Sequence, residues 1–352
     1  MVVKSITIKN FRNHNYLSYD FGDNLNVIVG DNGVGKTNLV ESIYYLSLAR
    51  SFRTNEDDEL IKDGKESAYI DAIIASGTNR HKVKVSFLKG VRKVFVDDKP
   101  IKRLSELSNI VNIILFEPRD VMLFRGSPKY RRDYLDISLS KKSPTYLGYI
   151  SQYEKLLKER NAILKQEKVD QDLLEATTEM MLKLSGPIIS YRQQYVQDIN
   201  NILDKIIYAL TGERSHARMI YEPFVPYDTN FDTSAKNAFK KALEGDLKKK
   251  VTSIGIHRED FQMTLNDKNI ASYGSQGENR LVAIALKLSP FFLIEDKDKR
   301  PIVILDDVMS ELDKNHQERL IAFLRKFQQV FITGTKINLD DAKTYVLSKK
   351  GD

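Results

Sequence analysis

The sequence has no cysteine, and only five of its 352 residues are histidine. The absence of cysteine excludes a disulfide framework and every zinc site built on thiolates. The histidines are scattered at positions 14, 81, 216, 257 and 316, with no pair at metal-ligand spacing. We therefore expect neither a zinc centre nor a catalytic triad built on histidine.

Long apolar runs are also missing. No window approaches the ~20 consecutive apolar residues of a transmembrane helix, so we expect no membrane span and no membrane partner. The N-terminal stretch MVVKSITIKNFRNHN alternates apolar and polar residues and lacks the apolar region of a signal peptide. These absences favour a cytoplasmic location.

The chain carries a net charge of +7, from 55 Lys and Arg against 48 Asp and Glu. A positive excess favours polyanionic partners, because neutralising phosphates releases counterions. Many basic proteins never bind nucleic acid, so the charge alone leaves both readings open.

The order of predicted elements is α/β, then helical, then α/β again. Residues 3–11 and 25–30 are predicted to form a hairpin, residues 36–48 a helix, and residues 68–98 an antiparallel meander. Helical periodicity dominates from about residue 145 to 250, with an expected kink or break at Gly186–Pro187. We predict one head split by a helical insertion, divided as 1–122 (N-terminal head, with the phosphate loop), 123–252 (helical arm) and 253–352 (C-terminal head).

The segment VIVGDNGVGKTNLVESIYYLS contains a complete GxxxxGK[ST] motif between an apolar strand and a helix. Its glycines let backbone N–H groups turn toward phosphates, and the helix N-terminus favours negative charge. Lys36 should reach the β and γ phosphates of a nucleoside triphosphate, and Thr37 should bind Mg²⁺. The predicted phosphate-binding residues are Gly30, Asp31, Asn32, Gly33, Val34, Gly35, Lys36 and Thr37.

A second strand, PIVILDD, ends in Asp306 and Asp307. An apolar run of this kind is typical of a parallel strand buried on both faces, and ligands bind at the carboxyl ends of such strands. We expect Asp306 to take part in Mg²⁺ binding and Asp307 to orient or deprotonate the attacking water, together with Lys36 as a catalytic residue.

The stretch Ser275, Gln276, Gly277 and Glu278 opens the helix SQGENRLVAIALKL. Ser275 and Glu278 have the spacing of a capping box, which is a purely structural role. The functional alternative is that this helix N-terminus faces a phosphate. A nucleotide already held by its own phosphate loop would then have to come from a second protomer.

The order phosphate loop, SQGE, apolar strand with DD, then SELD resembles the ABC-type ATPases of the SMC and Rad50 kind. The segments IKNFRNH, RSFRT, GSPKYRRDYLD, GIHREDF and VILDDVMSELD are similar to those of the RecF family of recombination mediators. This resemblance spans nearly the whole chain. It implies an α/β fold, namely an ABC-type P-loop ATPase head with an antiparallel β-meander subdomain and a helical insertion arm.

The resemblance also implies a slow, DNA-stimulated ATPase that uses ATP and Mg²⁺ and forms an ATP-dependent homodimer. Ser275–Glu278 of one protomer would cap the γ phosphate of the other, and Asp313 would line the dimer interface. The implied partners are double-stranded and gapped DNA, RecR and RecO, and indirectly RecA and SSB. His257 and Arg258, in GIHREDF, could form a local structural pair, but the resemblance favours a role at an interface or in sensing the nucleotide.

Three features depart from the broader ABC pattern. Glu117 stands where a Q-loop glutamine is expected, Asp307 replaces the usual glutamate, and FITGT has no switch histidine. Thr333 or Thr335 would take the place of that histidine. A transporter ATPase subunit remains the alternative function, although it would normally carry LSGGQ, a Q-loop and that histidine. We exclude an SMC or Rad50 head, because those proteins carry coiled-coil insertions of hundreds of residues and the arm of this chain is short. The absence of cysteine also excludes the CxxC hook of Rad50.

Basic residues in three regions are candidates for contacting DNA phosphates. For any single one of them, we favour the alternative of an ordinary solvated surface. They are Arg50 and Arg53, then Lys129, Arg131 and Arg132, and finally Lys240, Lys241, Lys248, Lys249 and Lys250.

Overall fold

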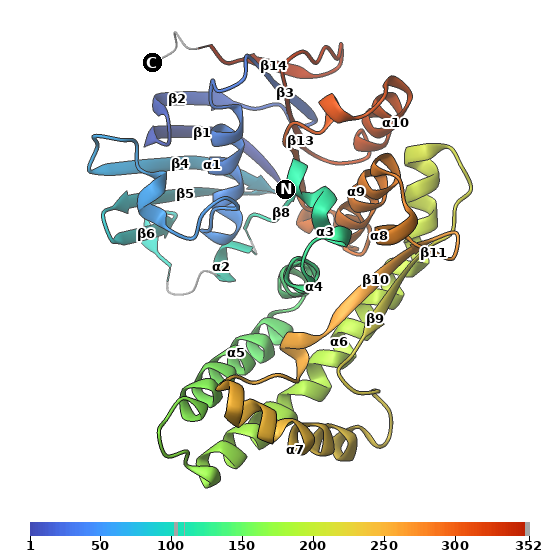
Figure 1. Ribbon diagram of the computed structural model, residues 1–352. Coiled ribbons are helices and arrows are strands. Elements are labelled where there is room, and N and C mark those ends of the chain that lie inside the picture. The colour runs from blue at the N-terminus through green and yellow to red at the C-terminus, as the bar shows by residue number, and fades with distance from the viewer. Residues whose placement is uncertain (102–104, 109, 349–352) are drawn as a thin grey trace. The chain divides into compact units, whose positions relative to one another are not determined.

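The computed structural model describes residues 1–101, 105–108 and 110–348, which form two compact units (Figure 1). Unit 1 comprises Met1–Asp120, Tyr208–Glu213 and the chain from Ile284 onward, and unit 2 comprises Val121–Ile207 and Arg214–Ala283. Each unit is described separately below. The domain boundaries predicted at 122/123 and 252/253 stay a prediction.

A six-stranded antiparallel sheet forms one layer of unit 1, in the order β2-β1-β4-β5-β6-β7. Its strands alternate between buried apolar and outward-facing residues, as a sheet with one covered face requires. They are β1 (Val2–Phe11), β2 (His14–Asp20), β4 (Ser67–Ser76), β5 (Asn79–Leu88), β6 (Val91–Val96) and β7 (Lys99–Pro100). The meander predicted for residues 68–98 is confirmed by β4, β5 and β6.

The predicted hairpin partner of residues 3–11 is wrong. β1 pairs with β2, with Ile8 opposite Leu17, whereas Leu25–Val29 forms β3 in a different sheet. The physical reason is visible in the residue pattern. HNYLSYD alternates and suits a sheet with one exposed face, whereas LNVIV is apolar at nearly every position and suits a strand buried on both faces.

The second layer of unit 1 is a parallel sheet in the order β14-β3-β13-β12-β8. Every pair that the structure describes in this sheet is parallel. The carboxyl ends of β3, β13 and β12 therefore lie side by side at one edge. Its strands are β3, β8 (Ile113–Phe116), β12 (Ile302–Leu305), β13 (Val330–Gly334) and β14 (Lys343–Val346).

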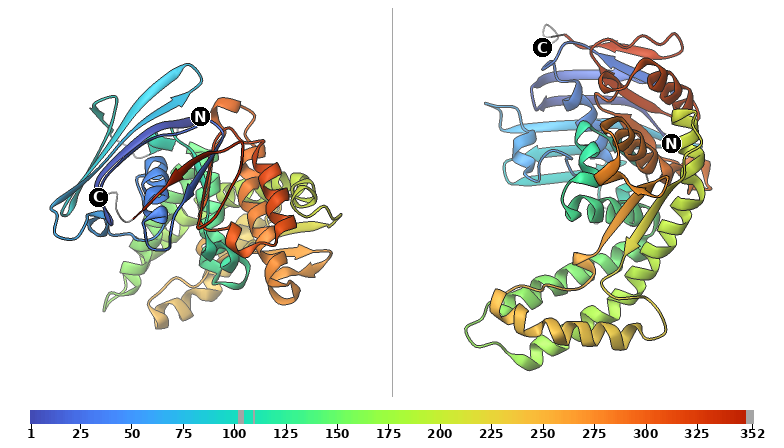
Figure 2. Two further views of the ribbon diagram at one scale, coloured as in Figure 1. Left: turned by 90° about the horizontal axis from the view of Figure 1, so that it is seen from above. Right: turned by 45° about the vertical axis from the view of Figure 1, so that its right-hand side comes forward.

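Helix α1 (Lys36–Leu48) packs between these two sheets, as Figure 2 shows on the inner side of the curved antiparallel sheet. Its Leu39 and Ile43 share one buried cluster with Ile6 of β1 and Ile304 of β12. The helix begins where the GK[ST] motif predicts, so the buried core fixes the position of the phosphate loop that precedes it. The remaining helices of unit 1 are α2 (Ser105–Ser108) and α10 (Lys314–Leu324).

Unit 2 combines helices with a three-stranded antiparallel sheet in the order β11-β10-β9. The strands are β9 (Ala217–Glu222), β10 (Asp260–Leu265) and β11 (Lys268–Asn269). The helices are α3 (Met122–Arg125), α4 (Pro128–Lys142), α5 (Pro144–Leu164), α7 (Phe231–Lys249) and α8 (Ile270–Tyr273). The turn predicted at Asn266–Asp267 joins β10 to β11, and both residues have positive φ, as a two-residue hairpin turn requires.

Two helices contribute residues to both units, α6 (Gln171–Thr211) and α9 (Gln276–Phe292). Helix α6 runs unbroken through Pro187 for 41 residues, so the alternative of a break at this position is wrong. A proline removes one backbone hydrogen bond from a helix. The adjoining Ile188 and Ile189 are fully buried, and this packing favours a continuous helix.

Two arginines with almost no exposed surface stabilise unit 2. Arg160 donates to Asp246 at 2.8 Å and to Thr252 at 2.7 Å, while Arg192 donates to Glu259 at 2.6 Å and to Asp136 at 2.7 Å. A buried charge is tolerated only when it is paired and hydrogen-bonded. Both arginines therefore hold the segment between α7 and β10 against the long helices.

Candidate nucleotide site

The phosphate loop connects β3 to α1 in unit 1. Gly35 has φ +102°, and a Cβ atom there would lie 2.4 Å from the imidazole ring of His14. Gly30 has φ +157°, and a Cβ atom there would lie 2.4 Å from the carbonyl oxygen of Leu347. Neither glycine can be replaced without displacing a neighbour, so the loop holds its backbone N–H groups in a fixed curve.

Lys36 lies within this curve. Its Nζ atom donates to the carbonyl oxygens of Gly30 at 2.7 Å and Asp31 at 2.9 Å, and the residue is 8% exposed. The ammonium group is therefore held over the loop in which phosphates would bind. A charged donor in this position suits the oxygens of a di- or triphosphate.

Asp306 and Thr37 come together at the carboxyl edge of the parallel sheet. The Thr37 hydroxyl donates to the carboxylate of Asp306, with Oγ1–Oδ1 and Oγ1–Oδ2 distances of 3.1 and 3.0 Å. Burial raises the pKa of Asp306 above its usual range, and hydrogen bonds from Thr333 and Thr37 oppose this effect. A hydroxyl beside a carboxylate is an oxygen-only set of the kind that Mg²⁺ prefers.

Thr333, on β13, lies beside both predicted acidic residues. Its hydroxyl donates to Asp306 Oδ1 at 2.7 Å and accepts a hydrogen bond from the backbone N–H of Asp307 at 2.9 Å. Thr335, the alternative switch residue, is exposed. Of the two threonines, the geometry thus brings Thr333 to the predicted site.

Asp307 has a left-handed backbone, with φ +51°. Its carbonyl accepts a hydrogen bond from the Ser310 hydroxyl at 3.0 Å, and its N–H donates to Thr333. Residues other than glycine seldom adopt this conformation, and aspartate and asparagine do so most readily. The hydrogen bonds on either side hold the aspartate in this conformation.

Glu117 directly follows β8, which is the neighbour of β12 in the sheet. Its backbone N–H donates to Asp120 Oδ2 at 2.8 Å, and Asp120 in turn pairs with Lys287. Burial raises the pKa of the Glu117 carboxyl. The position next to the strand of Asp306 agrees with the predicted Q-loop location, while its role stays a prediction.

A group of residues around α1 was not predicted as part of the nucleotide site, although one of them, Arg53, was predicted as a candidate for DNA contact. Glu41, fully buried on α1, accepts two hydrogen bonds from Arg12, at 2.9 and 2.6 Å, and one from Ser51 at 2.6 Å. Arg53 pairs with the same carboxylate at 3.3 Å and donates to Asn38 at 2.7 Å. The two segments IKNFRNH and RSFRT therefore meet at the helix that follows the phosphate loop. Their shared arginines were the only sequence signal of this contact.

In unit 2, Ser275 and Glu278 form the predicted capping box. The Ser275 N–H donates to Glu278 Oε2 at 2.7 Å, and the Glu278 N–H donates to Ser275 Oγ at 3.2 Å. The bond from the Ser275 backbone lowers the pKa of Glu278. Ser275, Gln276 and Gly277 are exposed, so this helix start is accessible to another molecule.

Asn279 and Arg125 hold the turn before this helix. Asn279 has no exposed surface, and its Nδ2 atom donates to the carbonyls of Ile270, Gly274 and Ser275 at 3.1, 3.1 and 2.8 Å. Arg125 donates to the same Gly274 carbonyl at 2.6 Å. Neither residue was predicted, and together they fix the backbone from which Ser275 projects.

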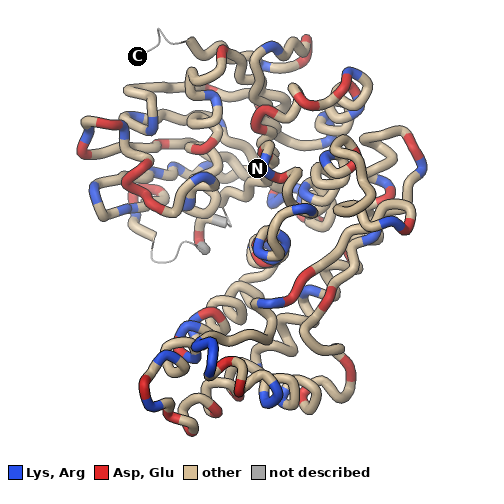
Figure 3. The backbone as a smooth tube through the Cα atoms, in the orientation of Figure 1, with Lys and Arg blue, Asp and Glu red and all other residues tan. Residues whose placement is uncertain are grey.

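The predicted DNA contacts lie in different surroundings. Arg131 is bound bidentately to Asp260, at 2.6 and 2.8 Å, and donates to three further carbonyl oxygens, so it has a structural role in unit 2. Arg132 donates to the Glu259 carbonyl, and Arg50 to Asn55. The exposed lysines are Lys129, Lys240, Lys241, Lys248, Lys249 and Lys250, of which Lys129 pairs with Asp133 and Lys248 with Glu244. Figure 3 shows Lys and Arg interspersed with Asp and Glu in both units.

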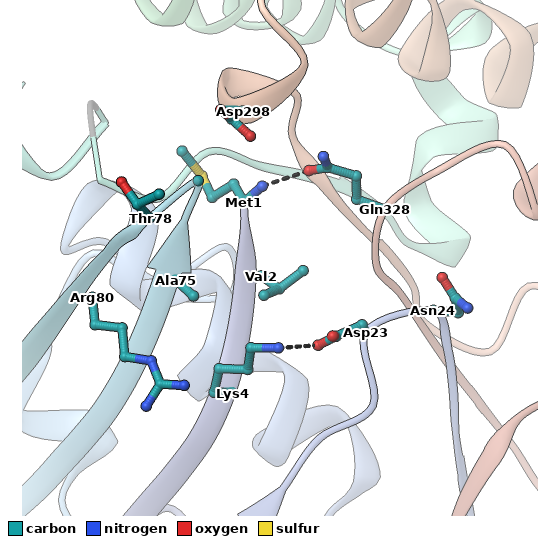
Figure 4. Close-up of a pocket in the computed structure, with 11 residues that line it drawn as sticks. Met1, Val2, Lys4, Asp23, Asn24, Ala75, Thr78, Arg80, Asp298 and Gln328 are labelled. Carbon is teal, nitrogen blue, oxygen red and sulfur yellow. Dashed lines mark hydrogen bonds and ion pairs between the residues drawn. The ribbon is translucent and has the colours of Figure 1, made fainter.

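A cavity of about 590 Å³ lies elsewhere in unit 1, beside the start of β1. Figure 4 shows its lining, which includes Lys4, Asp23, Arg80 and Asp298. None of its lining residues belongs to the phosphate loop or to the carboxyl edge of β12. Within the described residues, no group of three His, Asp or Glu side chains could hold a metal ion by itself, and no helix is long and apolar enough to cross a membrane.

Comparison with known proteins agrees with this geometry. A family model described as the RecF/RecN/SMC N terminal domain matches residues 2–347. Together, the fold and the site define an ABC-type ATPase of this class.

Within the class, the chain belongs to the RecF family. The DNA replication and repair protein RecF of Clostridium novyi is 34% identical over 98% of this chain and 96% of its own length. RecF of an Exiguobacterium species is 35% identical over 96% of this chain and 93% of its own. A solved recombination mediator protein RecF with ATP has a TM-score of 0.88 at 31% identity, covering 98% of this chain and 95% of that one.

A solved RecF with ATPrS has a TM-score of 0.89 at 31% identity, covering 99% of this chain and 98% of that chain. The SMC head domain of Pyrococcus furiosus is similar in fold alone, with a TM-score of 0.55 at 16% identity. The predicted family and fold class are both confirmed, and the chain is an ABC-type ATPase.

Proposed function

We propose that this protein is a DNA-binding ATPase that dimerises on binding ATP and acts in recombinational repair, helping with RecO and RecR to load RecA at single-strand gaps. The observation that carries this proposal is the match over 98% of the chain to a RecF solved with ATP and described as part of the RecFOR pathway. Its curated relatives are named as DNA replication and repair proteins. A transporter ATPase subunit is not favoured by these relatives.

The nucleotide would bind with its phosphates in the curve of residues 30–37. Lys36 would exchange its carbonyl partners for the β and γ phosphates, which offer charged acceptors. Thr37 and Asp306 would hold Mg²⁺, whose chemistry is to neutralise the charge that develops on the phosphates. Asp307 would orient the attacking water, and Thr333 would keep both aspartates in position.

The second half of the site would come from a second copy of the chain. Ser275 presents its hydroxyl at an exposed helix start, which favours an anion. Asp313, which caps α10 by accepting from the His316 N–H at 3.1 Å, would line the interface between the copies. ATP would then control whether two heads associate.

Sedimentation of the full chain with and without ATP, and with and without a gapped duplex, tests the proposal. We expect dimers only with ATP and a larger complex when DNA is added. DNA affinity should fall steeply with salt, because phosphate contacts release counterions. A monomer under every condition, or DNA affinity that does not change with salt, would contradict the proposal.

A further inference from the structure

One face of the antiparallel sheet in unit 1 carries a row of side chains that the nucleotide site does not use. The strand register places Tyr16 opposite Lys9, Lys9 opposite Tyr69, Tyr69 opposite Ser86, and Ser86 opposite Lys93. Side chains in directly opposed positions lie on the same face of a sheet. We call these five residues on β2, β1, β4, β5 and β6 the tyrosine–lysine row.

The row lies on the face of the sheet opposite α1. Its immediate neighbours along the strands, Ile8, Ile70 and Val94, belong to the buried cluster that contains α1, and successive side chains point to opposite faces. Tyr16 is 56% exposed and Tyr69 is 42% exposed. Both rings are therefore accessible to another molecule.

The two lysines of the row are available for an anion. Among the residues that the structure describes, no hydrogen bond or ion pair engages the ammonium group of Lys9 or Lys93. Two other lysines on this face of β5 differ in this respect, because Lys84 pairs with Asp98 at 2.6 Å and Lys82 with Asp71 at 3.5 Å. Positive charge without a protein partner is thus found beside the tyrosines.

Apolar surface continues the row at one end of the sheet. Leu88 and Val91 face each other across β5 and β6 and are 42% and 49% exposed. They share the outward face, because Leu88 lies two residues from Ser86 on β5 and Val91 lies two residues from Lys93 on β6. The surface therefore combines planar rings, a small aliphatic area and two cations, which is more apolar than a merely solvated sheet face requires.

We propose that the tyrosine–lysine row binds a short stretch of single-stranded DNA, with bases stacked on Tyr16 and Tyr69 and phosphates beside Lys9 and Lys93. Neighbouring strands lie about 4.8 Å apart, so Lys9 is one strand away from each ring and the two rings are about 10 Å apart. Stacking accepts any base, because every base has a planar face.

The proposal rests on the proposed function in taking DNA as the polyanion. It adds that this surface would contact the single-stranded part of a gap. A lipid surface would call for a larger cluster of basic residues and a broader apolar area than Leu88 and Val91 provide. An acidic protein segment could pair with the lysines, but it would not require two exposed rings in line with them.

The absence of tryptophan from the chain provides a direct test. The variant Tyr69→Trp carries a single indole on this face, and Tyr208→Trp, at a residue of unit 1 that is 54% exposed on α6, is the matched control. We expect oligo(dT) to quench the fluorescence of Tyr69→Trp in a saturable manner and to leave Tyr208→Trp unchanged. Quenching should be lost when Lys9→Gln and Lys93→Gln are added.

Anisotropy of a labelled oligo(dT) gives an independent measurement. Tyr16→Ala and Tyr69→Ala should each weaken binding by roughly tenfold, and Tyr208→Ala should not, because base–aromatic stacking contributes at that level. ATP binding and gapped-duplex binding of the same variants are measured in parallel. Intact gapped-duplex binding with no effect of these substitutions on oligo(dT) would overturn this inference alone, whereas wild-type protein that binds no DNA would overturn the proposed function.

Two further results would also overturn the inference. Quenching of Tyr69→Trp by anionic phospholipid vesicles but not by oligo(dT) would assign the surface to a membrane. Quenching by a polyglutamate peptide but not by oligo(dT) would assign it to an acidic protein partner.

Discussion

Thr333 Oγ1 lies 2.7 Å from Asp306 Oδ1 and donates a hydrogen bond to it. The same hydroxyl accepts from the backbone N–H of Asp307, so one side chain on β13 positions both acidic residues that follow β12. Thr333 is fully buried, so the packing around it fixes the hydroxyl that makes these two contacts.

Thr333→Val should lower ATP turnover by about tenfold or more while leaving ATP binding in place, because it removes a hydrogen bond of about 1–3 kcal/mol from a buried carboxylate. Thr333→Ser keeps the hydroxyl and should retain most of the turnover. Steady-state hydrolysis and nucleotide affinity are the two measurements. Equal loss in the Val and Ser variants would indicate a packing effect and contradict the positioning role.

Lys36→Met should weaken ATP binding by roughly 100-fold, since it removes charge-assisted hydrogen bonds to phosphate oxygens. The thermal unfolding of the nucleotide-free protein should change little. Equilibrium binding of a fluorescent ATP analogue measures the effect. A dissociation constant equal to that of the unsubstituted protein would refute the role of Lys36.

Ser275→Arg should leave ATP binding nearly intact and abolish ATP-driven dimerisation, because a large cation would replace the small hydroxyl at the exposed helix start. Ser272→Arg, at an exposed position three residues earlier on α8, is the control and should still dimerise. Light scattering with and without ATP decides between the outcomes. Dimers that persist in Ser275→Arg would argue against a site shared between two copies.

Asn279→Leu should also impair dimerisation with ATP binding retained, because three backbone carbonyls would lose the amide that holds the Ser275 turn. We expect a stability loss of about 1–3 kcal/mol from the lost side-chain hydrogen bonds, although each carbonyl keeps one other donor. Asn112→Leu is a matched control, since Asn112 is also a buried asparagine but lies in unit 1. If both variants dimerise normally with ATP, the positioning role of Asn279 is wrong.

The stability of the protein should fall as the pH is lowered from about 6.5 to about 4, in part because of His257. Burial lowers the pKa of His257 from 6.5 to about 4, so over this range the unfolded chain binds a proton that the folded protein does not. The contribution is present above the unfolded pKa and is lost as pH falls, by up to about 3 kcal/mol.

His257→Gln is the control for this pH dependence. Glutamine can replace both hydrogen bonds of His257, to Tyr153 and to the Thr252 carbonyl, but does not titrate. Its free energy of unfolding should change less between pH 7 and pH 4.5 than that of the unsubstituted protein. An identical pH dependence in the two proteins would show that His257 does not contribute.

Features that depend on a few adjacent residues were predicted correctly, whereas features that depend on the arrangement of distant strands were not. The start of α1 at Lys36 and the capping box at Ser275 follow from a few adjacent residues, and the structure confirms both. The partner of β1 was predicted wrongly, because strand pairing depends on the whole sheet. The contact of Thr333 with Asp306 could not be predicted either, since it exists only because β13 lies between β3 and β12.

Residues whose role depends on burial were also missed. Glu41 and Asn279 both lie within helices. The local sequence gives no sign that Arg12 would bind the carboxylate of Glu41, or that the amide of Asn279 would bind three carbonyls. Arg131 illustrates the reverse case. In the sequence it is one of several basic residues, and only the fold shows that Asp260 and three carbonyls engage it.

The left-handed backbone of Asp307 limits which amino acids this position can accept during evolution or engineering. A glutamate would offer the same carboxylate with a longer reach, but it tolerates positive φ less well than aspartate or asparagine. Aspartate therefore suits this position because of its backbone preference as well as its carboxylate. Asparagine is the replacement that keeps both shape and conformation while removing the charge. Asp307→Asn is therefore suited to trapping the ATP-loaded state for structural study.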